Sequence, residues 1–113
     1  MSEEDLIREV MRNRVLSVPA RLGIMLYLLA KGEARFADIQ YALNLTPGNL
    51  WSHLRRLEEA GYVRIYRRFE DRPRTVVRVT GRGVEEVSKY LNNLLEAAEN
   101  ALRTARRRGG GGR

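Results

Sequence analysis

Residues 46–80 read TPGNLWSHLRRLEEAGYVRIYRRFEDRPRTVVRVT, and the first half of this stretch predicts a short helix. Thr46 suits the capping position, and Pro47 suits the first position inside the helix. Gly61 is expected to end the helix, because glycine readily adopts the left-handed backbone conformation of a C-terminal cap. One side of the helix is apolar, because leucines recur at intervals of four and three residues, at Leu50, Leu54 and Leu57.

The second half of the stretch predicts a hairpin directly after the helix. Residues 62–69 and 74–80 are rich in Val, Ile, Tyr and Thr and flank a turn at residues 70–73. Between residues 61 and 82 there are only two acids, Glu70 and Asp71. The same segment holds seven arginines, namely Arg64, Arg67, Arg68, Arg72, Arg74, Arg78 and Arg82.

The positive charge of the chain is concentrated in this hairpin and in the residues after it. Residues 1–60 hold eight Lys or Arg and eight Asp or Glu, whereas residues 61–113 hold thirteen and six, which accounts for the whole net charge of +7. A localised basic region of this kind favours a polyanionic partner. The alternative is a solvated strand face whose arginines serve solubility.

Two further helices are predicted before the central stretch. Ser2, with acids at residues 3–5, can start a helix over residues 3–16. Ser17 can cap a second helix that carries Pro19 in its first turn and ends at Lys31. This second helix is expected to be the central core helix, with an apolar side of Leu22, Met25, Leu26 and Leu29 that Ile24, Tyr27 and Leu28 widen.

A short third helix precedes the helix that begins at Pro47. It is expected over residues 37–43, after an extended link at 33–36 that can add a small strand to the hairpin, and its inward residues are Ile39, Ala42 and Leu43. Residues 44–46 then form a tight turn. Two short helices joined by such a turn are a helix-turn-helix, in which the second helix enters the major groove of DNA.

Thr80 can cap a last helix with an apolar seam that meets a partner helix. The seam recurs at steps of three and four residues, at Val84, Val87, Leu91, Leu94, Ala98, Ala101 and Ala105. Its length favours pairing with a second copy of the chain, through an interface of Leu6, Val10, Val84, Val87, Leu91, Leu94, Ala98 and Ala101. Packing against the first helix of the same chain is the alternative. We expect one domain over residues 1–105 and a flexible Arg/Gly tail over residues 106–113.

The side of the fourth helix opposite its leucines is the candidate DNA-reading surface. Its candidate contacts, with the two residues that open the helix, are Thr46, Pro47, Gly48, Asn49, Trp51, Ser52, Arg55 and Arg56. Salt bridging to Glu59, or simple exposure to solvent, is the alternative role of the two arginines. Trp51 can either contact DNA or cover an apolar seam beside the hairpin. His53 lies at the edge of the apolar side and is expected to be a hydrogen-bonded, partly buried histidine.

The hairpin is the second candidate contact with DNA. Its candidate residues are Arg67, Arg68, Arg72 and Arg74. Arg72 and Arg74 flank Pro73, which stiffens the tip, and narrow minor grooves attract arginine. Arg67 and Arg68 point to opposite faces of their strand, so at most one of them shares the DNA-facing side.

The segments PARLGIMLYLL, FADIQYALNLTPGNLWSHLRRLEEAGYV and RPRTVVRVTGRGVEEVSKYL resemble winged helix-turn-helix transcriptional regulators of the MarR and ArsR type over residues 15–95. The similarity is greatest to their small single-domain branch of archaea and bacteria, through its signature G-N-L-x-x-H-L-x-x-L-E-x-A-G-Y-V. It implies a mostly helical α+β fold with a two-stranded wing and a C-terminal dimerisation helix, and a homodimer that binds operator DNA, often as a repressor. Trp51 stands where the family commonly has Ser, and the Cys/His sets of the metal-sensing branch are absent.

Other classes of function have little support in the sequence. The chain has no cysteine and one histidine, so we expect no metal site and no cofactor, and no nucleophile is paired with a base as an enzyme requires. No apolar run reaches the length that crosses a membrane, and the acidic start is unlike a signal peptide, which favours the cytoplasm. Two alternatives remain, a chromatin-type protein that coats double-stranded DNA and a winged-helix protein-interaction module. No residue identifies a small-molecule effector.

Overall fold

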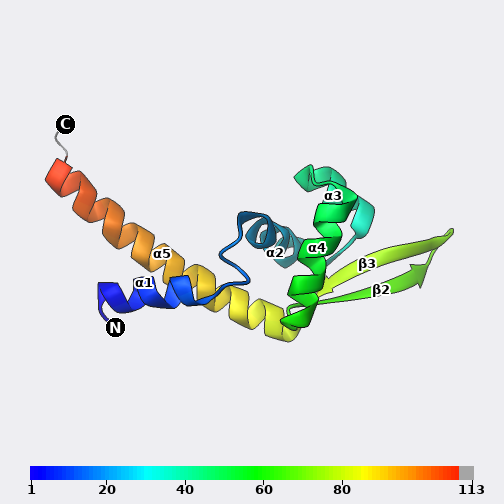
Figure 1. Ribbon diagram of the computed structural model, residues 1–113, viewed down its shortest axis with the longest axis horizontal. Helices are drawn as coiled ribbons and strands as arrows, with labels where there is room; N and C mark the ends of the chain where they lie inside the picture. The colour runs from blue at the N-terminus through cyan, green and yellow to red at the C-terminus, as the bar shows by residue number, and fades with distance from the viewer. Residues whose placement is uncertain (110–113) are drawn as a thin grey trace.

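Five helices and three short strands make up the part of the chain that this computed structural model describes, residues 1–109. In chain order they are α1 (Glu3–Arg12), α2 (Pro19–Lys31), β1 (Glu33–Arg35), α3 (Phe36–Leu43), α4 (Pro47–Glu59), β2 (Val63–Phe69), β3 (Pro73–Val79) and α5 (Gly81–Gly109). The β2–β3 hairpin projects from one end of the molecule, and the long α5 extends toward the other end (Figure 1). The predicted winged helix-turn-helix is confirmed.

The sheet has three antiparallel strands in the order β1-β3-β2. Glu33 on β1 pairs with Arg78 on β3, and Arg78 pairs in turn with Arg64 on β2. The link after α2 therefore adds the small strand that its extended sequence predicts. The wing itself is the two-stranded β2–β3 hairpin.

The core lies where α2, α3 and α4 meet the sheet and the start of α5. Its fully buried members include Ile24, Met25 and Leu28 of α2 and all three leucines of the apolar side of α4. The central position of α2 is therefore confirmed. Two inward predictions were wrong: Leu26 is 47% exposed, and Ala42 of α3 is also exposed, because the core reaches these helices from one side only.

The segment between α1 and α2 differs from the expected continuous helix. α1 begins with the predicted cap of Ser2 but ends at Arg12, because Asn13 has an extended backbone and its Oδ1 accepts a hydrogen bond from the Leu16 amide at 2.8 Å. Leu16 is fully buried. The residue before α2 is Val18, which makes no side-chain capping bond, so Ser17 is not the cap.

The start of α5 is tied tightly to the end of α4. The Thr80 hydroxyl accepts a hydrogen bond from the Gly83 amide at 2.9 Å, as expected of a cap, and donates one to the Gly61 carbonyl at 2.6 Å. Gly61 has the left-handed backbone predicted for it, with φ of 82°. These bonds set the direction in which α5 leaves the winged domain.

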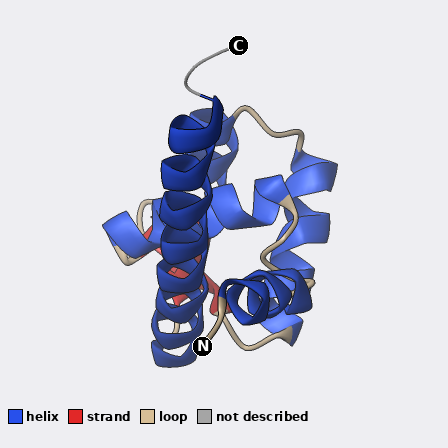
Figure 2. Cartoon of the chain, turned by 90° about the vertical axis from the view of Figure 1, so that its left-hand side faces the viewer, coloured by secondary structure: helices blue, strands red, loops and turns tan. Residues whose placement is uncertain are grey.

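α1 packs along α5, which crosses the front of the molecule when viewed from the side of the termini (Figure 2). α5 continues through Arg106, Arg107 and Arg108 to Gly109, where the sequence predicts a tail, because arginine is a good helix former and suits a helix C-terminus. The rest of that expected tail, residues 110–113, lies outside the described residues. Within residues 1–109, no helix combines the length and apolarity needed to span a bilayer.

Candidate nucleic-acid interface

The turn between α3 and α4 sets the orientation of the candidate recognition helix. Asn44 ends α3 in the left-handed conformation, with φ of 54°, a conformation that asparagine tolerates better than most residues. Thr46 then caps α4, and its Oγ1 accepts a hydrogen bond from the Asn49 amide at 3.2 Å. Leu50, buried one turn into the helix, anchors α4 to the core.

The outward side of α4 is open to solvent. All eight candidate contacts are exposed, namely Thr46, Pro47, Gly48, Asn49, Trp51, Ser52, Arg55 and Arg56. Within residues 1–109, neither Arg55 nor Arg56 is part of an ion pair, so the alternative pairing with Glu59 is not observed. Their guanidinium groups are available to an external acceptor.

Trp51 lies at the edge of this exposed side and contacts Phe36, the first residue of α3. The two ring centroids are 5.0 Å apart, and the rings are tilted by 37°. Trp51 is nevertheless 39% exposed. One part of the indole therefore covers an apolar side chain and another part faces solvent, and contact of Trp51 with DNA stays a prediction.

Glu33 forms ion pairs with two arginines, Arg68 and Arg78, on the outer face of the sheet. It accepts hydrogen bonds from Arg68, from Arg78 at 2.8 and 3.0 Å, and from the Tyr66 hydroxyl at 3.0 Å. The bond from Arg68 does most to lower the pKa of Glu33 to about 2, followed by those from Arg78 and Tyr66. Sequence reasoning did not identify Glu33, because residues 33 and 78 meet only when β1 joins the sheet.

The four candidate arginines of the wing are in different environments. Arg68 is bound to Glu33, and Arg74 donates to both oxygens of Asp71 at 2.9 and 3.1 Å, a bond that lowers the pKa of Asp71. Arg67 is exposed and donates to Thr75 at 3.0 Å. Arg72 is exposed at the tip and forms no ion pair within the described chain. Arg72 and Arg67 are thus better placed for an external partner than Arg68 and Arg74.

His53 differs in one respect from its predicted role. It is partly buried as expected, but its Nδ1 is buried with no hydrogen-bond partner among the described residues. Burial lowers the pKa of His53, and the charge of Arg21 lowers it further. The imidazole is therefore held in its neutral form near neutral pH. No group of three or more His, Cys, Asp or Glu within residues 1–109 is arranged to bind a metal ion.

The residues expected at a dimer interface divide into buried and exposed sets. Leu6 and Val87 are buried within the single chain, so they have no surface left for a partner. Ala98 and Ala101 are exposed, and Val84 is 45% exposed. An apolar groove of about 250 Å³ runs between α1 and α5, lined by Ile7, Val10, Met11, Leu94, Ala97 and Ala98. The seam of α5 thus packs partly against α1, as the alternative interpretation expected, and remains partly open.

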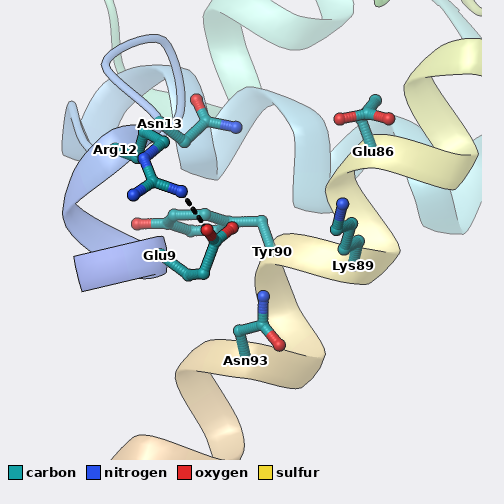
Figure 3. Close-up of a pocket in the computed structure, with 7 residues that line it drawn as sticks. All are labelled: Glu9, Arg12, Asn13, Glu86, Lys89, Tyr90 and Asn93. Atoms are coloured by element: carbon teal, nitrogen blue, oxygen red, sulfur yellow. Dashed lines mark hydrogen bonds and ion pairs between the residues drawn. The ribbon is translucent and has the colours of Figure 1, made fainter. Parts of the chain in front are cut away.

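A separate polar pocket of about 210 Å³ lies nearer the winged domain (Figure 3). α1 and the residue after it contribute Glu9, Arg12 and Asn13, and α5 contributes Glu86, Lys89, Tyr90 and Asn93. Glu9 and Arg12 form an ion pair at its edge, and the Tyr90 ring is largely buried. The Asn13 amide donates to the Tyr62 hydroxyl at 3.4 Å, which links the pocket to the start of the wing. Sequence reasoning did not find this pocket, because its residues come from the two ends of the chain.

Comparison with known proteins supports the same fold and class. A family model described as the winged helix DNA-binding domain matches residues 20–97. A transcriptional regulator homologue from Pyrococcus horikoshii OT3 is 44% identical, covers 86% of this chain and 97% of its own, and has a TM-score of 0.83. The chain is also 28% identical over 88 residues to an uncharacterised protein of Methanocaldococcus jannaschii, spanning 77% of this chain and 96% of that one.

The crystal structure of MarR shares the fold at 21% identity, with a TM-score of 0.69 over 92% of this chain and 83% of that one. This structural match covers more of the chain than residues 20–97, which the family model matches. The chain therefore belongs to the winged helix DNA-binding domain family and is a winged-helix transcriptional regulator with a MarR-type fold.

Proposed function

We propose that this protein is a homodimeric repressor that binds operator DNA in the cytoplasm, with α4 in the major groove and the tip of the wing on the flanking backbone. The observation that supports this most strongly is the outward side of α4. It is exposed, mostly polar and free of ion pairs within residues 1–109, while three buried leucines hold the helix rigidly from behind. A rigid helix with such a surface fits a groove about 12 Å wide.

The residues of α4 divide by position along the helix. Thr46, Pro47 and Gly48 open the helix, where unpaired amides and the helix dipole favour a phosphate group. Asn49 and Ser52 reach base edges with their hydrogen-bonding groups. Arg55 and Arg56, one turn further on, reach guanine or the backbone.

The wing supplies electrostatic attraction to DNA that does not depend on the base sequence. Arg72 at the tip and Arg67 on β2 make the contacts with phosphates or with the minor groove. Arg68 and Arg74 hold the hairpin in shape through their carboxylate partners. Only two of the four arginines expected at the wing are therefore assigned to DNA.

Pairing of two chains places two copies of α4 on one duplex. The outer half of α5 exposes Leu95 and Leu102, 59% and 53% accessible, and α1 exposes Ile7 and Met11, which are 51% and 71% accessible. A second copy laid on this surface buries all four side chains. Two recognition helices joined in this way meet major grooves about 34 Å apart, which requires a pseudo-palindromic site. A dimer bound across a promoter represses by excluding the transcription machinery.

Selection of bound fragments from random and genomic DNA by the purified protein tests this proposal. We expect enrichment of a pseudo-palindrome with half-sites about one helical turn apart, and a dissociation constant that rises steeply with salt. An enriched single half-site would remove the dimer from the proposal. Failure to retain any duplex at low salt would contradict DNA binding altogether.

A second candidate function is supported by the exposed basic end of α5. Arg103, Arg106, Arg107 and Arg108 all lie on the outer turns of this helix. Such a surface suits a protein that coats DNA without reading its sequence. The ratio of specific to nonspecific affinity at one salt concentration separates the two functions: a ratio near one favours coating, whereas a ratio of about 10³ or more is typical of a specific regulator.

A further inference from the structure

Trp51 is the one large apolar side chain that α4 exposes in the described structure. The residues around it on the outward side are polar or small, as the exposed Gly48, Ser52 and Arg55 illustrate. A hydrogen-bonding group would suit a base edge in most positions of the major groove. The indole ring instead brings apolar surface to the groove.

The position of the Trp51 ring is set before any partner arrives. Phe36, which stacks against it at 5.0 Å, is half-buried and packs against the core cluster. A side chain that is already ordered loses little rotamer entropy when it contacts a ligand. Trp51 therefore offers a rigid, partly exposed edge rather than a mobile side chain.

Trp51 and Arg55 are four residues apart on α4, so they are neighbours on one side of the helix. Arg55 is exposed and forms no ion pair within residues 1–109, which leaves it free to bind the O6 and N7 atoms of guanine. Groups so close together reach the same base pair or adjacent ones. The two side chains therefore contact one short stretch of the operator sequence.

We propose that Trp51 reads thymine by packing the edge of its indole ring on the thymine C5-methyl group, next to the guanine that Arg55 contacts. The methyl group is the apolar feature that the major groove presents, and it distinguishes thymine from the other bases. This inference rests on the proposed function, since it names the base that the same surface selects. It predicts a thymine beside a guanine in each half-site of the enriched sequence.

The first test uses the unmodified protein, because Trp51 is its sole tryptophan. Acrylamide quenches the fluorescence of a solvent-exposed indole. We expect the selected duplex to reduce this quenching strongly, whereas a scrambled duplex of equal length, bound at low salt, reduces it much less. Equal quenching with and without the selected duplex would overturn the proposal, because it would show that the indole stays in water in the complex.

The second test replaces single thymines of the selected duplex with uracil, which lacks the methyl group and keeps every hydrogen-bonding group. Loss of one buried methyl contact weakens binding about fourfold. We expect this loss at one thymine in each half-site and no change at the others. If no single replacement weakens binding while the duplex is still selected over scrambled DNA, the thymine reading is wrong and the proposed function remains. Failure to bind the duplex at all would instead contradict the proposed function.

The third test uses substitutions to determine whether Trp51 is the residue that distinguishes thymine from uracil. The Trp51→Ser variant is expected to bind the thymine and uracil duplexes equally. Tyr41→Ser is the matched control, because Tyr41 is an aromatic residue that is 91% exposed on α3, and its loss should leave the fourfold difference intact. Trp51→Phe keeps an aromatic ring against Phe36, so it should fold and retain part of the difference. A full fourfold difference in Trp51→Ser, with its circular dichroism spectrum unchanged, would overturn the assignment.

Discussion

Glu33 on β1 accepts two hydrogen bonds from Arg78 on β3, at 3.0 Å from Nε and at 2.8 Å from Nη2. The two residues are also direct partners in the register of the sheet. The same carboxylate binds Arg68 of β2, so one side chain connects all three strands. Part of the positive charge of the wing is therefore neutralised within the chain and acts in the sheet rather than on a partner.

This carboxylate makes stability depend on pH on the acid side. The pKa of Glu33 is lowered from 4.5 to about 2 in the folded protein, so its ion pairs contribute fully above pH 4.5, and their contribution is lost as the pH falls through about 2. We expect Glu33→Gln to be less stable than the unmodified protein near pH 7 and to approach it near pH 2. Urea unfolding across this range measures the difference.

The control for this series is Glu99→Gln. Glu99 is exposed on α5 and forms no ion pair within residues 1–109. Its loss should change stability little at any pH. A difference between Glu33→Gln and the unmodified protein that stays constant from pH 7 to pH 2 would show that the ion pairs of Glu33 add no stability.

The arginines of α4 and of the wing should differ in what they contribute to DNA binding. Replacing Arg55 and Arg56 by alanine should remove preference for the selected duplex over scrambled DNA. Arg72→Ala should weaken binding to both duplexes alike. Because one phosphate contact is lost, the slope of the logarithm of the binding constant against the logarithm of salt concentration should fall by about one. Fluorescence anisotropy at several salt concentrations measures both effects.

Arg103→Ala is the control for these variants, because Arg103 lies on α5 and donates to Asn100 at 2.7 Å. It should leave sequence preference unchanged. Equal, uniform losses of affinity in the α4 and wing variants would instead assign both regions to phosphate contact.

A close contact at the start of α5 should make one glycine intolerant of substitution. A Cβ atom at Gly83 would lie 2.2 Å from the Tyr62 carbonyl oxygen, which belongs to the backbone and cannot turn aside. We expect Gly83→Ala to lower the free energy of unfolding by about 2 kcal/mol, as overpacking does. Gly81→Ala, two residues earlier and with open space around it, should leave stability unchanged or raise it. Thermal unfolding compares the two, and equal melting temperatures would contradict the expected clash.

The exposed outer half of α5 should carry the dimer. Leu102→Lys introduces a charge into the surface that we expect a second copy to bury, so the variant should elute as a monomer with the light-scattering mass of one chain. Tyr41→Lys, on the exposed side of α3, should keep the mass of the unmodified protein. A monomeric unmodified protein would remove the dimer from the proposed function, and a dimeric Leu102→Lys would place the interface elsewhere.

The elements that could be predicted are those with local signals. The Thr46 cap, Pro47 and the spacing of the three leucines lie within one short segment, and they specify both the start of α4 and its buried side. The hairpin was predictable from its strand-forming residues and its turn. The end of α1 could not be predicted, because apolar residues at helical spacing, among them Leu6, Val10 and Val15, continue past Asn13. In the folded chain the Asn13 side chain instead bonds to the Leu16 amide.

Local signals in the amino-acid sequence specify the winged helix-turn-helix and the surface of α4, since helix caps, apolar spacing and turn residues act over a few positions. Which arginines remain available depends on the folded chain alone. Arg68 and Arg78 meet Glu33 across gaps of 35 and 45 residues, and Trp51 meets Phe36 across a helix-turn-helix. Such contacts depend on which strand joins the sheet edge and on how two helices cross. The type of a residue does not by itself specify which residue, distant in the sequence, it will contact.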